Sequence, residues 1–431
     1  MNKFLPVIEF ASPDEIAALQ LEKLQRMLQF LNANSTFYKR HFLRHKVDVT
    51  KIQSLADLQQ IPPAVKDDLQ NFNMDFLCVP SESIAEYTST SGTLGKPVTI
   101  ALSSNDLERL AYNEAVGFTC ADGSSADLYQ LMLTLDRQFM AGVAYYQGIR
   151  KLNAGLIRVG PGVPAMQWDT ILRLKPNTIV GVPSFMLKLV EYAMQNGIDV
   201  NATAVKKAIC IGENIRTPEL KPNGLASRIT DLWKIKLFGT YASTEMQTAF
   251  TECSHGVGGH LHPELIIVEI LDENNLPVLP GTEGEVTITT LGVEGMPLLR
   301  YKTGDIAAMF TDKCGCGRTT PRLGPVIGRK QQMLKLKGTT VYPPAIFDLL
   351  NSIENIIDYR VAARTTDMGT DEIQIHLVAS TGSEEKTIAE LTANFRSRLR
   401  VVPEIITSTP LALEKMTSVG SRKVSKFIDL R

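Results

Sequence analysis

No run of apolar residues in the 431-residue chain approaches the roughly 20 residues that a membrane-spanning helix needs. The charges almost cancel, at a formal net charge of −1, so no overall field attracts nucleic acid or an anionic membrane. The six cysteines are too few to form a stabilising disulfide framework in a chain of this length. Pro6 and Glu9 interrupt the first residues, which therefore lack the apolar core of a signal peptide. These absences predict a cytoplasmic protein that binds neither nucleic acid nor a membrane.

The composition is that of an ordinary globular protein, with 44% hydrophobic and 21% charged residues. The length suggests about two or three domains. Short apolar strands alternate with helical segments between residues 128 and 238, which predicts an α/β sheet with crossover helices. The expected strands include residues 155–159, 178–182 and 207–211, and the expected helices are residues 166–174 and 184–195. Consecutive strands at residues 265–271 and 284–290 then predict an appended β region.

The C-terminal part of the chain has the pattern of a separate unit. Strand, helix, strand, strand, helix and strand follow one another, which is the order of a small α+β ferredoxin-like domain. These elements cover residues 334–337, 343–353, 359–364, 372–380, 384–399 and 404–409. We therefore expect an α/β fold with two domains, residues 1–328 and residues 329–431.

Residues 87–97, YTSTSGTLGKP, combine small hydroxyl side chains with two glycines in a Gly-x-x-Gly spacing and one lysine. Glycine lets successive N–H groups turn toward one anion, and hydroxyls add donors without bulk. The segment therefore predicts a loop between strands that wraps a polyphosphate. It differs from the NTPase P-loop in its glycine spacing, and an ordinary hairpin turn is the alternative. The candidate ligands are Ser89, Thr90, Ser91, Gly92, Thr93, Gly95 and Lys96.

Two later segments offer groups for a flat ring, a phosphate and a metal ion. Gly212, followed by Glu213, comes after an expected strand and allows a ring to approach the backbone closely, although an ordinary turn is the alternative. Farther along, Tyr241 offers an aromatic face to a base, Thr244 a hydroxyl to a phosphate and Glu245 a carboxylate to Mg²⁺. The alternative for this second segment is a helix N-cap.

Two further segments offer groups for a sugar. Asp305 ends the tight turn Thr303-Gly304-Asp305, and its carboxylate can accept hydrogen bonds from both hydroxyls of a ribose. An aspartate in a surface turn is the alternative. Arg329 follows Gly328 near the expected domain junction and can reach a ribose or a phosphate, with an interdomain salt bridge as the alternative.

Taken in their order along the chain, these segments resemble the core motifs of acyl-adenylate-forming enzymes, and most closely those of the phenylacetate–CoA ligase family. The resemblance covers nearly the whole chain. Its motifs lie at residues 61–69, 90–97, 181–184, 241–245, 301–305, 328–329, 341–343 and 422–431.

The resemblance implies a reaction in two steps. A carboxylic acid attacks the α-phosphate of ATP to give acyl-AMP and pyrophosphate, and coenzyme A then displaces AMP to give a thioester. The first step must overcome the repulsion between a carboxylate and a triphosphate. The resemblance assigns Thr244 to the α-phosphate, Glu245 to Mg²⁺ and Lys423 to the position between carboxylate and α-phosphate.

The resemblance also assigns the remaining nucleotide contacts. Residues 89–96 hold the β- and γ-phosphates, Tyr241 and Gly212 sandwich the adenine, and Asp305 binds the ribose. The other expected nucleotide-binding residues are Glu213, Ala242, Ser243 and Arg329.

A lid motion of the C-terminal domain between the two steps is a further implication. Hinges in the family usually carry an acidic pair where this chain has Gln331 and Gln332, and Phe347 stands where an acidic residue is common. These departures keep open a second hypothesis, an enzyme that adenylates an acid but transfers it to an acceptor other than coenzyme A. A nucleotide-binding regulator without turnover is the third hypothesis.

Three cysteines and a histidine suggest a metal site. Cys253, Cys314 and Cys316 with one imidazole can complete a tetrahedral, structural Zn²⁺ site. Among the nearby histidines, the resemblance favours His260. Reduced surface cysteines in a β loop are the alternative.

The acid pocket is expected near residues 136–147 and 181–185. The first segment carries bulky side chains, namely Phe139, Met140, Tyr145 and Tyr146. This composition and the resemblance both favour a medium-sized or aromatic carboxylic acid. The expected partners are therefore this acid, ATP and coenzyme A, with a homodimer as one alternative for the assembly.

Overall fold

The computed structural model describes residues 4–90, 98–336, 339–365, 371–399, 401–416 and 425–431. The chain forms two compact units, one of Met1–Pro222 with Ile229–Pro325 and the other of Asn223–Arg228 with Val326–Arg431. The division after residue 328 and the role of residues 329–431 as a lid remain predictions. Among the helices in the described ranges, none has the length and apolar character needed to cross a bilayer.

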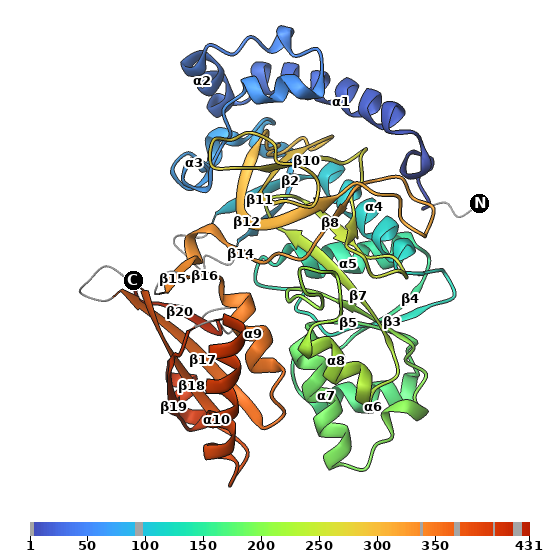
Figure 1. Ribbon diagram of the computed structural model, residues 1–431. Coiled ribbons are helices and arrows are strands. Elements are labelled where there is room, and N and C mark those ends of the chain that lie inside the picture. The colour runs from blue at the N-terminus through green and yellow to red at the C-terminus, as the bar shows by residue number, and fades with distance from the viewer. Residues whose placement is uncertain (1–3, 91–97, 337–338, 366–370, 400, 417–424) are drawn as a thin grey trace. The chain divides into compact units, whose positions relative to one another are not determined.

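A mostly parallel sheet lies in the first unit (Figure 1). Its strands are β3 (Leu128–Leu131), β4 (Gly155–Arg158), β5 (Thr178–Gly181), β6 (Lys207–Cys210), β7 (Lys236–Ser243) and β8 (Thr248–Thr251). Their order across the sheet is β4-β3-β5-β6-β7-β8, and β8 alone runs antiparallel to its neighbour. All residues of β5 are buried, as expected of a strand covered on both faces.

Helices cover both faces of this sheet. They are α4 (Ser104–Cys120), α5 (Met140–Lys151), α6 (Pro164–Leu174) and α7 (Pro183–Gln195), and α8 (Gly224–Leu232) follows in the chain. Helices α4 and α5 pack together on one face, and α6 and α7 pack together on the other (Figure 1). Proline opens both α6 and α7, where its missing N–H is not needed. The predicted α/β sheet with crossover helices is confirmed.

An antiparallel sheet forms the β region of the first unit. Its strands are β9 (Gly259–His260), β10 (Ile266–Leu271), β11 (Glu283–Thr290), β12 (Tyr301–Phe310) and β13 (Arg322–Leu323). They follow one another in the order β10-β11-β12-β13-β9. The strands predicted at residues 265–271 and 284–290 are confirmed as β10 and β11.

The N-terminal helices lie along the antiparallel sheet (Figure 1). They are α1 (Pro13–Asn34), α2 (Thr36–His45) and α3 (Lys66–Asn71). A capping box starts α1, because the Ser12 hydroxyl accepts from the Glu15 N–H and the Glu15 carboxylate accepts from the Ser12 N–H. Leu28 of α1 and Ile288 of β11 belong to one buried apolar cluster, which holds the helix on the sheet.

The hairpin of β1 (Ile84–Ser89) and β2 (Thr99–Ser103) carries the expected phosphate loop. Ser89 pairs with Thr99 across the two antiparallel strands. The prediction that this loop lies between strands is confirmed. The loop's own residues 91–97 lie outside the described residues.

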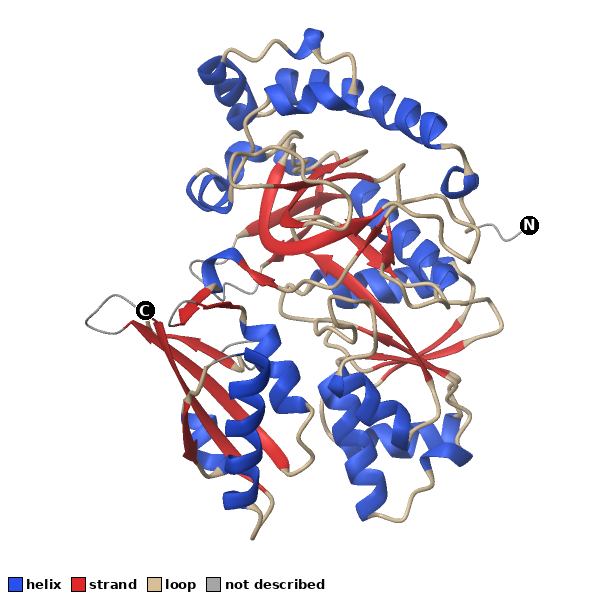
Figure 2. Cartoon of the chain, in the orientation of Figure 1, coloured by secondary structure: helices blue, strands red, loops and turns tan. Residues whose placement is uncertain are grey.

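The second unit contains a four-stranded sheet in the order β19-β18-β17-β20. Its strands are β17 (Ile356–Thr365), β18 (Asp371–Ala379), β19 (Glu404–Thr407) and β20 (Phe427–Asp429); the other elements are β14 (Gly328–Arg329), β15 (Leu334–Leu336), β16 (Thr339–Val341), α9 (Pro343–Asn351), α10 (Glu384–Asn394) and α11 (Pro410–Lys415). Helices α9 and α10 pack side by side against this sheet (Figure 2).

One strand of this sheet differs from the ferredoxin-like prediction. The segment predicted as its first strand pairs locally with β16 in a separate hairpin. Instead, β20 from the C-terminal tail runs parallel to β17, and Phe427 enters the apolar core of the unit. A buried aromatic residue in an otherwise polar tail is a weak signal, and the prediction missed it.

Candidate active site

Several candidate residues follow the carboxyl ends of parallel strands. From β3 the chain leaves toward β4 on one side of the sheet, and from β5 it leaves toward β6 on the other. Such a change of direction opens a crevice at the carboxyl ends of the strands, where α/β proteins bind ligands. Gly212 follows β6, and Tyr241 lies near the end of β7. The sheet therefore brings these two candidates to the same edge.

Gly212 and Glu213 form a turn at which a ligand can approach the backbone closely. Gly212 has φ of +72°, a conformation that side-chain-bearing residues rarely adopt. The Glu213 carboxylate accepts hydrogen bonds from the N–H and the hydroxyl of Ser184, each at 2.9 Å. Glu213 thus caps the first turn of α7 and ties the ends of β5 and β6 together. Its expected nucleotide contact remains a prediction.

Tyr241 and Asp305 lie in direct contact. The Tyr241 hydroxyl donates a 2.7 Å hydrogen bond to the Asp305 carboxylate, which is buried on β12. The Asp305 N–H donates to the Thr303 hydroxyl at 3.1 Å, and Gly304 between them has φ of +79°. The structure therefore joins the residue expected to stack on adenine with the residue expected to bind ribose, although they stand on different sheets.

Ala242 and Ser243 end β7, and Thr244 and Glu245 lie in the turn that leads to β8. The alternative interpretation of this segment as a helix N-cap is wrong, because the chain reverses into a strand instead of starting a helix. The Ser243 hydroxyl accepts from the Met246 N–H at 3.2 Å, which stabilises the turn. The side chains of Thr244 and Glu245 are half-buried.

Arg109 of α4 holds this turn in place through buried hydrogen bonds. Its guanidinium is buried and donates to the Gln247 carbonyl at 2.6 Å and to the Thr248 hydroxyl at 3.1 Å. A third hydrogen bond runs from Arg109 Nη2 to the Leu265 carbonyl at 2.6 Å. Multiple donors in a rigid plane make arginine suited to such a brace. Nothing in the sequence pattern indicated this role.

The base of the phosphate loop lies beside the expected acid region. The Ser89 N–H donates to the Gln138 carbonyl at 3.1 Å. Thr90 closes the loop, because its hydroxyl accepts from the Val98 N–H at 3.0 Å and its own N–H donates to the Val98 carbonyl at 3.0 Å. The other loop candidates, Ser91, Gly92, Thr93, Gly95 and Lys96, lie outside the described residues.

Two further candidates, Arg329 and Lys423, belong to the second unit. Arg329 ends β14 and is exposed. Lys423 lies outside the described residues. The roles expected of both remain predictions.

The expected acid region is built on α5. Met140 and Tyr145 are buried on this helix, and Phe139 precedes it. Tyr145 belongs to the apolar cluster that includes Ile211, next to Gly212, and that Val182 also contacts. The expected acid region and adenine region are therefore adjacent.

The predicted metal ligands converge in the β region. The ligand atoms of Cys253, His260, Cys314 and Cys316 all lie within 4.8 Å of one another. The sulfur atoms of Cys253 and Cys314 are 3.6 Å apart, and the Cys316 sulfur lies 3.4 Å from His260 Nε2. Four such donors suit a tetrahedral ion with bonds of roughly 2.0–2.3 Å. Three of the four residues are buried, which differs from the surface position assumed in the alternative of reduced cysteines, and zinc binding itself remains a prediction.

The surroundings of the cluster suit a cation. Burial lowers the pKa of His260 to about 3, so the imidazole is neutral, and Thr320 contacts its Nδ1 at 3.1 Å. Burial raises the pKa of the Cys316 thiol, but hydrogen bonds with Arg318, Cys314 and Cys253 together outweigh this and lower the pKa overall. Cys120 is buried in one apolar cluster with Cys253 and Cys314, although it is not one of the four candidate ligands.

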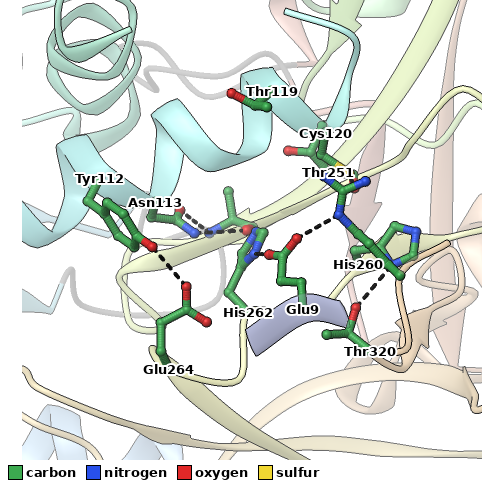
Figure 3. A network of polar contacts seen from close by, with 12 residues as sticks. Glu9, Tyr112, Asn113, Thr119, Cys120, Thr251, His260, His262, Glu264 and Thr320 are labelled. Atoms are coloured by element: carbon green, nitrogen blue, oxygen red, sulfur yellow. Dashed lines mark hydrogen bonds and ion pairs between the residues drawn. The ribbon is translucent and has the colours of Figure 1, made fainter. Parts of the chain in front are cut away.

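A buried network ties the N-terminal segment to this cluster (Figure 3). The Glu9 carboxylate contacts His262 Nδ1 and accepts from Arg318 Nε, both at 2.6 Å. The Glu9 carbonyl accepts from the Thr319 N–H at 2.8 Å. Burial alone would raise the pKa of Glu9, but His262 and Arg318 outweigh it and lower the pKa. The N-terminal turn is therefore fixed by charge as well as by packing.

Residues 17–295 match the family model described as AMP-binding enzyme. The chain belongs to this family. The phenylacetate-coenzyme A ligase of Aromatoleum evansii is 27% identical over 99% of this chain and 97% of that protein. The phenylacetate-coenzyme A ligase of Thermus thermophilus is 28% identical over 84% of this chain and 81% of that protein. A crystal structure of 2-hydroxyisobutyryl-CoA ligase in the postadenylation state shares the fold, with a TM-score of 0.87, 22% identity, and coverage of 99% of this chain and 92% of that one.

Membership in the AMP-binding enzyme family confirms the resemblance seen in the motifs. The matched residues include the candidates from Ser89 to Glu245. Asp305, Arg329 and Lys423 lie beyond them. The individual roles of all these residues in an AMP-binding enzyme remain predictions.

Proposed function

We propose that the protein is an ATP-dependent carboxylic acid–CoA ligase that forms acyl-AMP and then acyl-CoA. The observation that carries the proposal is the Tyr241–Asp305 contact at the edge of the parallel sheet. It offers a stacking surface and a ribose acceptor side by side, one strand away from Gly212. The naming of four relatives as phenylacetate-coenzyme A ligases supports the same reaction.

The groups expected around the α-phosphate suit the first step of the reaction, the formation of acyl-AMP. A carboxylate approaching a triphosphate needs cations and N–H donors at the α-phosphate. Thr244 supplies a hydroxyl there, and we assign Lys423 as the cation that accompanies the attacking carboxylate. The β- and γ-phosphates leave as pyrophosphate along the loop that Ser89 and Thr90 anchor.

Glu245 is suited to hold Mg²⁺. Its carboxylate is half-buried at the β7–β8 turn and forms no ion pair within the described ranges. Carboxylate oxygens are ligands that Mg²⁺ prefers, and the ion would neutralise charge on the phosphates. Arg109 holds the turn in place, so the carboxylate is presented from a rigid support.

The acid is proposed to be an aryl or medium-sized one. Phe139, Met140, Tyr145 and Tyr146 are large and mostly apolar, which favours a substrate with an apolar body. The phenylacetate named for the relatives is consistent with this size. We also keep the cytoplasm as the expected location and a homodimer as an untested assembly.

The Cys253, His260, Cys314 and Cys316 cluster is proposed to hold one structural Zn²⁺. Four protein ligands leave no open coordination position, so the ion would stabilise the β region and take no part in the reaction. Burial raises the pKa of Cys253 to about 12, so without a metal ion the thiol stays protonated. A bound cation would stabilise the thiolate and so lower this pKa.

A coupled assay tests the reaction. The protein is incubated with ATP, Mg²⁺ and a panel of carboxylic acids, and pyrophosphate is measured with and without coenzyme A. The proposal expects acid-dependent pyrophosphate in both cases and a thioester only with coenzyme A. If no acid releases pyrophosphate, the proposal is wrong.

A second candidate function keeps the adenylation and changes the acceptor. The segment Lys330–Gln332 carries Gln331 and Gln332 in place of the acidic hinge pair that is usual in the family. Preformed acyl-AMP offered with coenzyme A, an amine or a carrier-protein thiol distinguishes the two. Transfer to the amine or carrier protein, with none to coenzyme A, would favour this candidate.

A further inference from the structure

Glu114 is a buried carboxyl group without a hydrogen-bond or ion-pair partner among the residues that the structure describes. It lies on α4 and exposes 5% of its surface. Within the described part of the chain it forms neither a hydrogen bond nor an ion pair. Burial raises its pKa to about 8, so the group is neutral at neutral pH. An unpaired buried polar group is destabilising, and its presence in a folded protein calls for an explanation.

The helix directs Glu114 toward α5. The two preceding residues, Tyr112 and Asn113, point toward Glu264 and the β8 backbone (Figure 3). Glu114, at the next helical position, meets Gly148 of α5, where an added Cβ would lie 2.3 Å from the Glu114 Cβ. The absence of a side chain at Gly148 lets the two helices approach closely at this point.

Tyr145 connects Glu114 to the candidate active site. It lies on α5, one turn before Gly148, and interacts electrostatically with Glu114. Its side chain forms a hydrogen bond with Thr240, the residue before Tyr241. The Thr240 hydroxyl also lies 3.2 Å from the Thr251 hydroxyl. Glu114 thus packs against the helix that forms the expected acid region, close to a small group of hydroxyl side chains.

The Glu114 carboxyl group is almost completely enclosed, but 5% of the residue's surface stays exposed. Side-chain atoms that are both fully enclosed and without a partner include Gln130 Oε1 and His262 Nε2, whereas the Glu114 oxygens are not among them.

We infer that Glu114 is a specificity-determining residue that hydrogen-bonds a hydroxyl group on the acyl part of the acid. The inference rests on the proposed function and deepens it. A neutral carboxyl group has one donor and further acceptor capacity, which matches a hydroxyl group. An acid with a bare alkyl or phenyl body leaves Glu114 unpaired in the complex, so the site discriminates against it.

Matched pairs of acids test the inference. Acid-dependent pyrophosphate release is measured with 4-hydroxyphenylacetate against phenylacetate and with 3-hydroxybutyrate against butyrate. In at least one pair the protein should favour the hydroxylated acid in kcat/KM by about tenfold or more. Glu114→Leu should abolish or reverse this preference, and Glu114→Gln should retain part of it.

Glu108→Gln is the control on the same helix. Glu108 is exposed and pairs with Lys151 on the surface. This variant should keep the preference of the unaltered protein. Thermal denaturation of each variant with and without ATP shows whether it folds and binds nucleotide. Where Glu114→Leu does not fold, Glu114→Gln carries the test and must reduce the preference.

The experiment distinguishes failure of the proposed function from failure of the inference about Glu114. A protein that adenylates no acid contradicts the proposed function itself. A protein that adenylates acids but shows no hydroxyl preference, or shows the same preference after substitution of Glu114, overturns this inference and leaves the proposed function standing.

Discussion

At the level of a single residue, we expect two tasks of Tyr241: its ring is predicted to stack on adenine, and its hydroxyl donates a hydrogen bond to Asp305. The phenol–carboxylate contact is short and links two sheets of the first unit. A carboxylate held in this way is oriented before any nucleotide arrives. Preorganisation of this kind lowers the free-energy cost of binding.

Removing the hydroxyl separates the two tasks. Tyr241→Phe keeps the ring and should raise KM for ATP by roughly fivefold to tenfold, because a hydrogen bond to a charged group contributes about 1.5 kcal/mol. Steady-state kinetics measures the change. Tyr192→Phe, a half-buried tyrosine on α7, serves as the control and should leave KM unchanged. An unchanged KM for Tyr241→Phe would contradict the ribose role of Asp305.

Glu114 should make folding stability depend on pH. Its pKa is about 8 in the folded protein because of burial, and near 4.3 in an unfolded chain. The stability that its neutral form contributes is full below the unfolded pKa and is lost as pH rises through about 8. Glu114→Gln, which cannot ionise, should therefore flatten the fall in unfolding free energy between about pH 5 and pH 8.

Urea unfolding at several pH values measures this slope. Glu108→Gln is the matched control and should follow the unaltered protein. Parallel curves for Glu114→Gln and the unaltered protein would show that Glu114 has an ordinary pKa.

The limits of sequence reasoning are clearest at this scale. Candidates such as Tyr241 and Asp305 could be named because each stands in a short motif with its own chemistry. Glu114 and Arg109 could not, because their roles depend on burial and on partners far along the chain. A helical position alone does not reveal that a glutamate faces a neighbouring helix and has no partner there.

At the scale of elements, the N-terminal turn Val7–Phe10 is held by an ion network. Glu9 is fully buried and contacts both His262 and Arg318. Its interior position was not predictable, since a glutamate near the start of a chain is usually solvated. The capping box of the following helix was predictable, because its signal lies within four consecutive residues.

Neutralising Glu9 should destabilise the protein strongly. Glu9→Gln leaves Arg318 buried without its counter-ion, which is expected to cost about 3 kcal/mol of unfolding free energy. The urea midpoint reports the loss. Glu22→Gln removes half of an exposed pair and should change the stability by less than about 1 kcal/mol. Equal midpoints for the two variants would argue against the network.

The cysteine cluster should bind about one zinc ion per chain. Cys314→Ser should lose the metal and lower the melting temperature, because a structural ion contributes its binding energy to folding. Metal analysis after purification without chelator measures the content. Cys78→Ser alters a buried cysteine elsewhere and should keep the zinc. A zinc content near zero in the unaltered protein would exclude the site.

The strand predictions show what local patterns can and cannot reveal. The buried parallel strands were recognisable as short apolar runs between helices. The position of β15 was not, because the same apolar pattern suits either a local hairpin or a place in the four-stranded sheet. Pairing partners depend on tertiary packing, which a single strand pattern does not encode.

At the scale of the whole molecule, the two units divide the expected work. The first unit holds the candidates for the adenine, the ribose and Mg²⁺, while Lys423 belongs to the second. Because Lys423 is predicted to be catalytic and belongs to a separate unit, we also expect a domain motion during the reaction. Lys423→Ala should therefore lower acyl-AMP formation by about a hundredfold or more while leaving ATP binding nearly unchanged. Adenylation at an unaltered rate would remove Lys423 from the mechanism.

The most direct test of the account is mass spectrometry of the products formed from ATP, Mg²⁺, coenzyme A and a panel of carboxylic acids. The account predicts AMP and an acyl-CoA in equal amounts, both dependent on the acid, with acyl-AMP accumulating when coenzyme A is left out. Formation of neither acyl-AMP nor acyl-CoA from any acid, by a folded protein whose melting temperature rises with ATP, would contradict it.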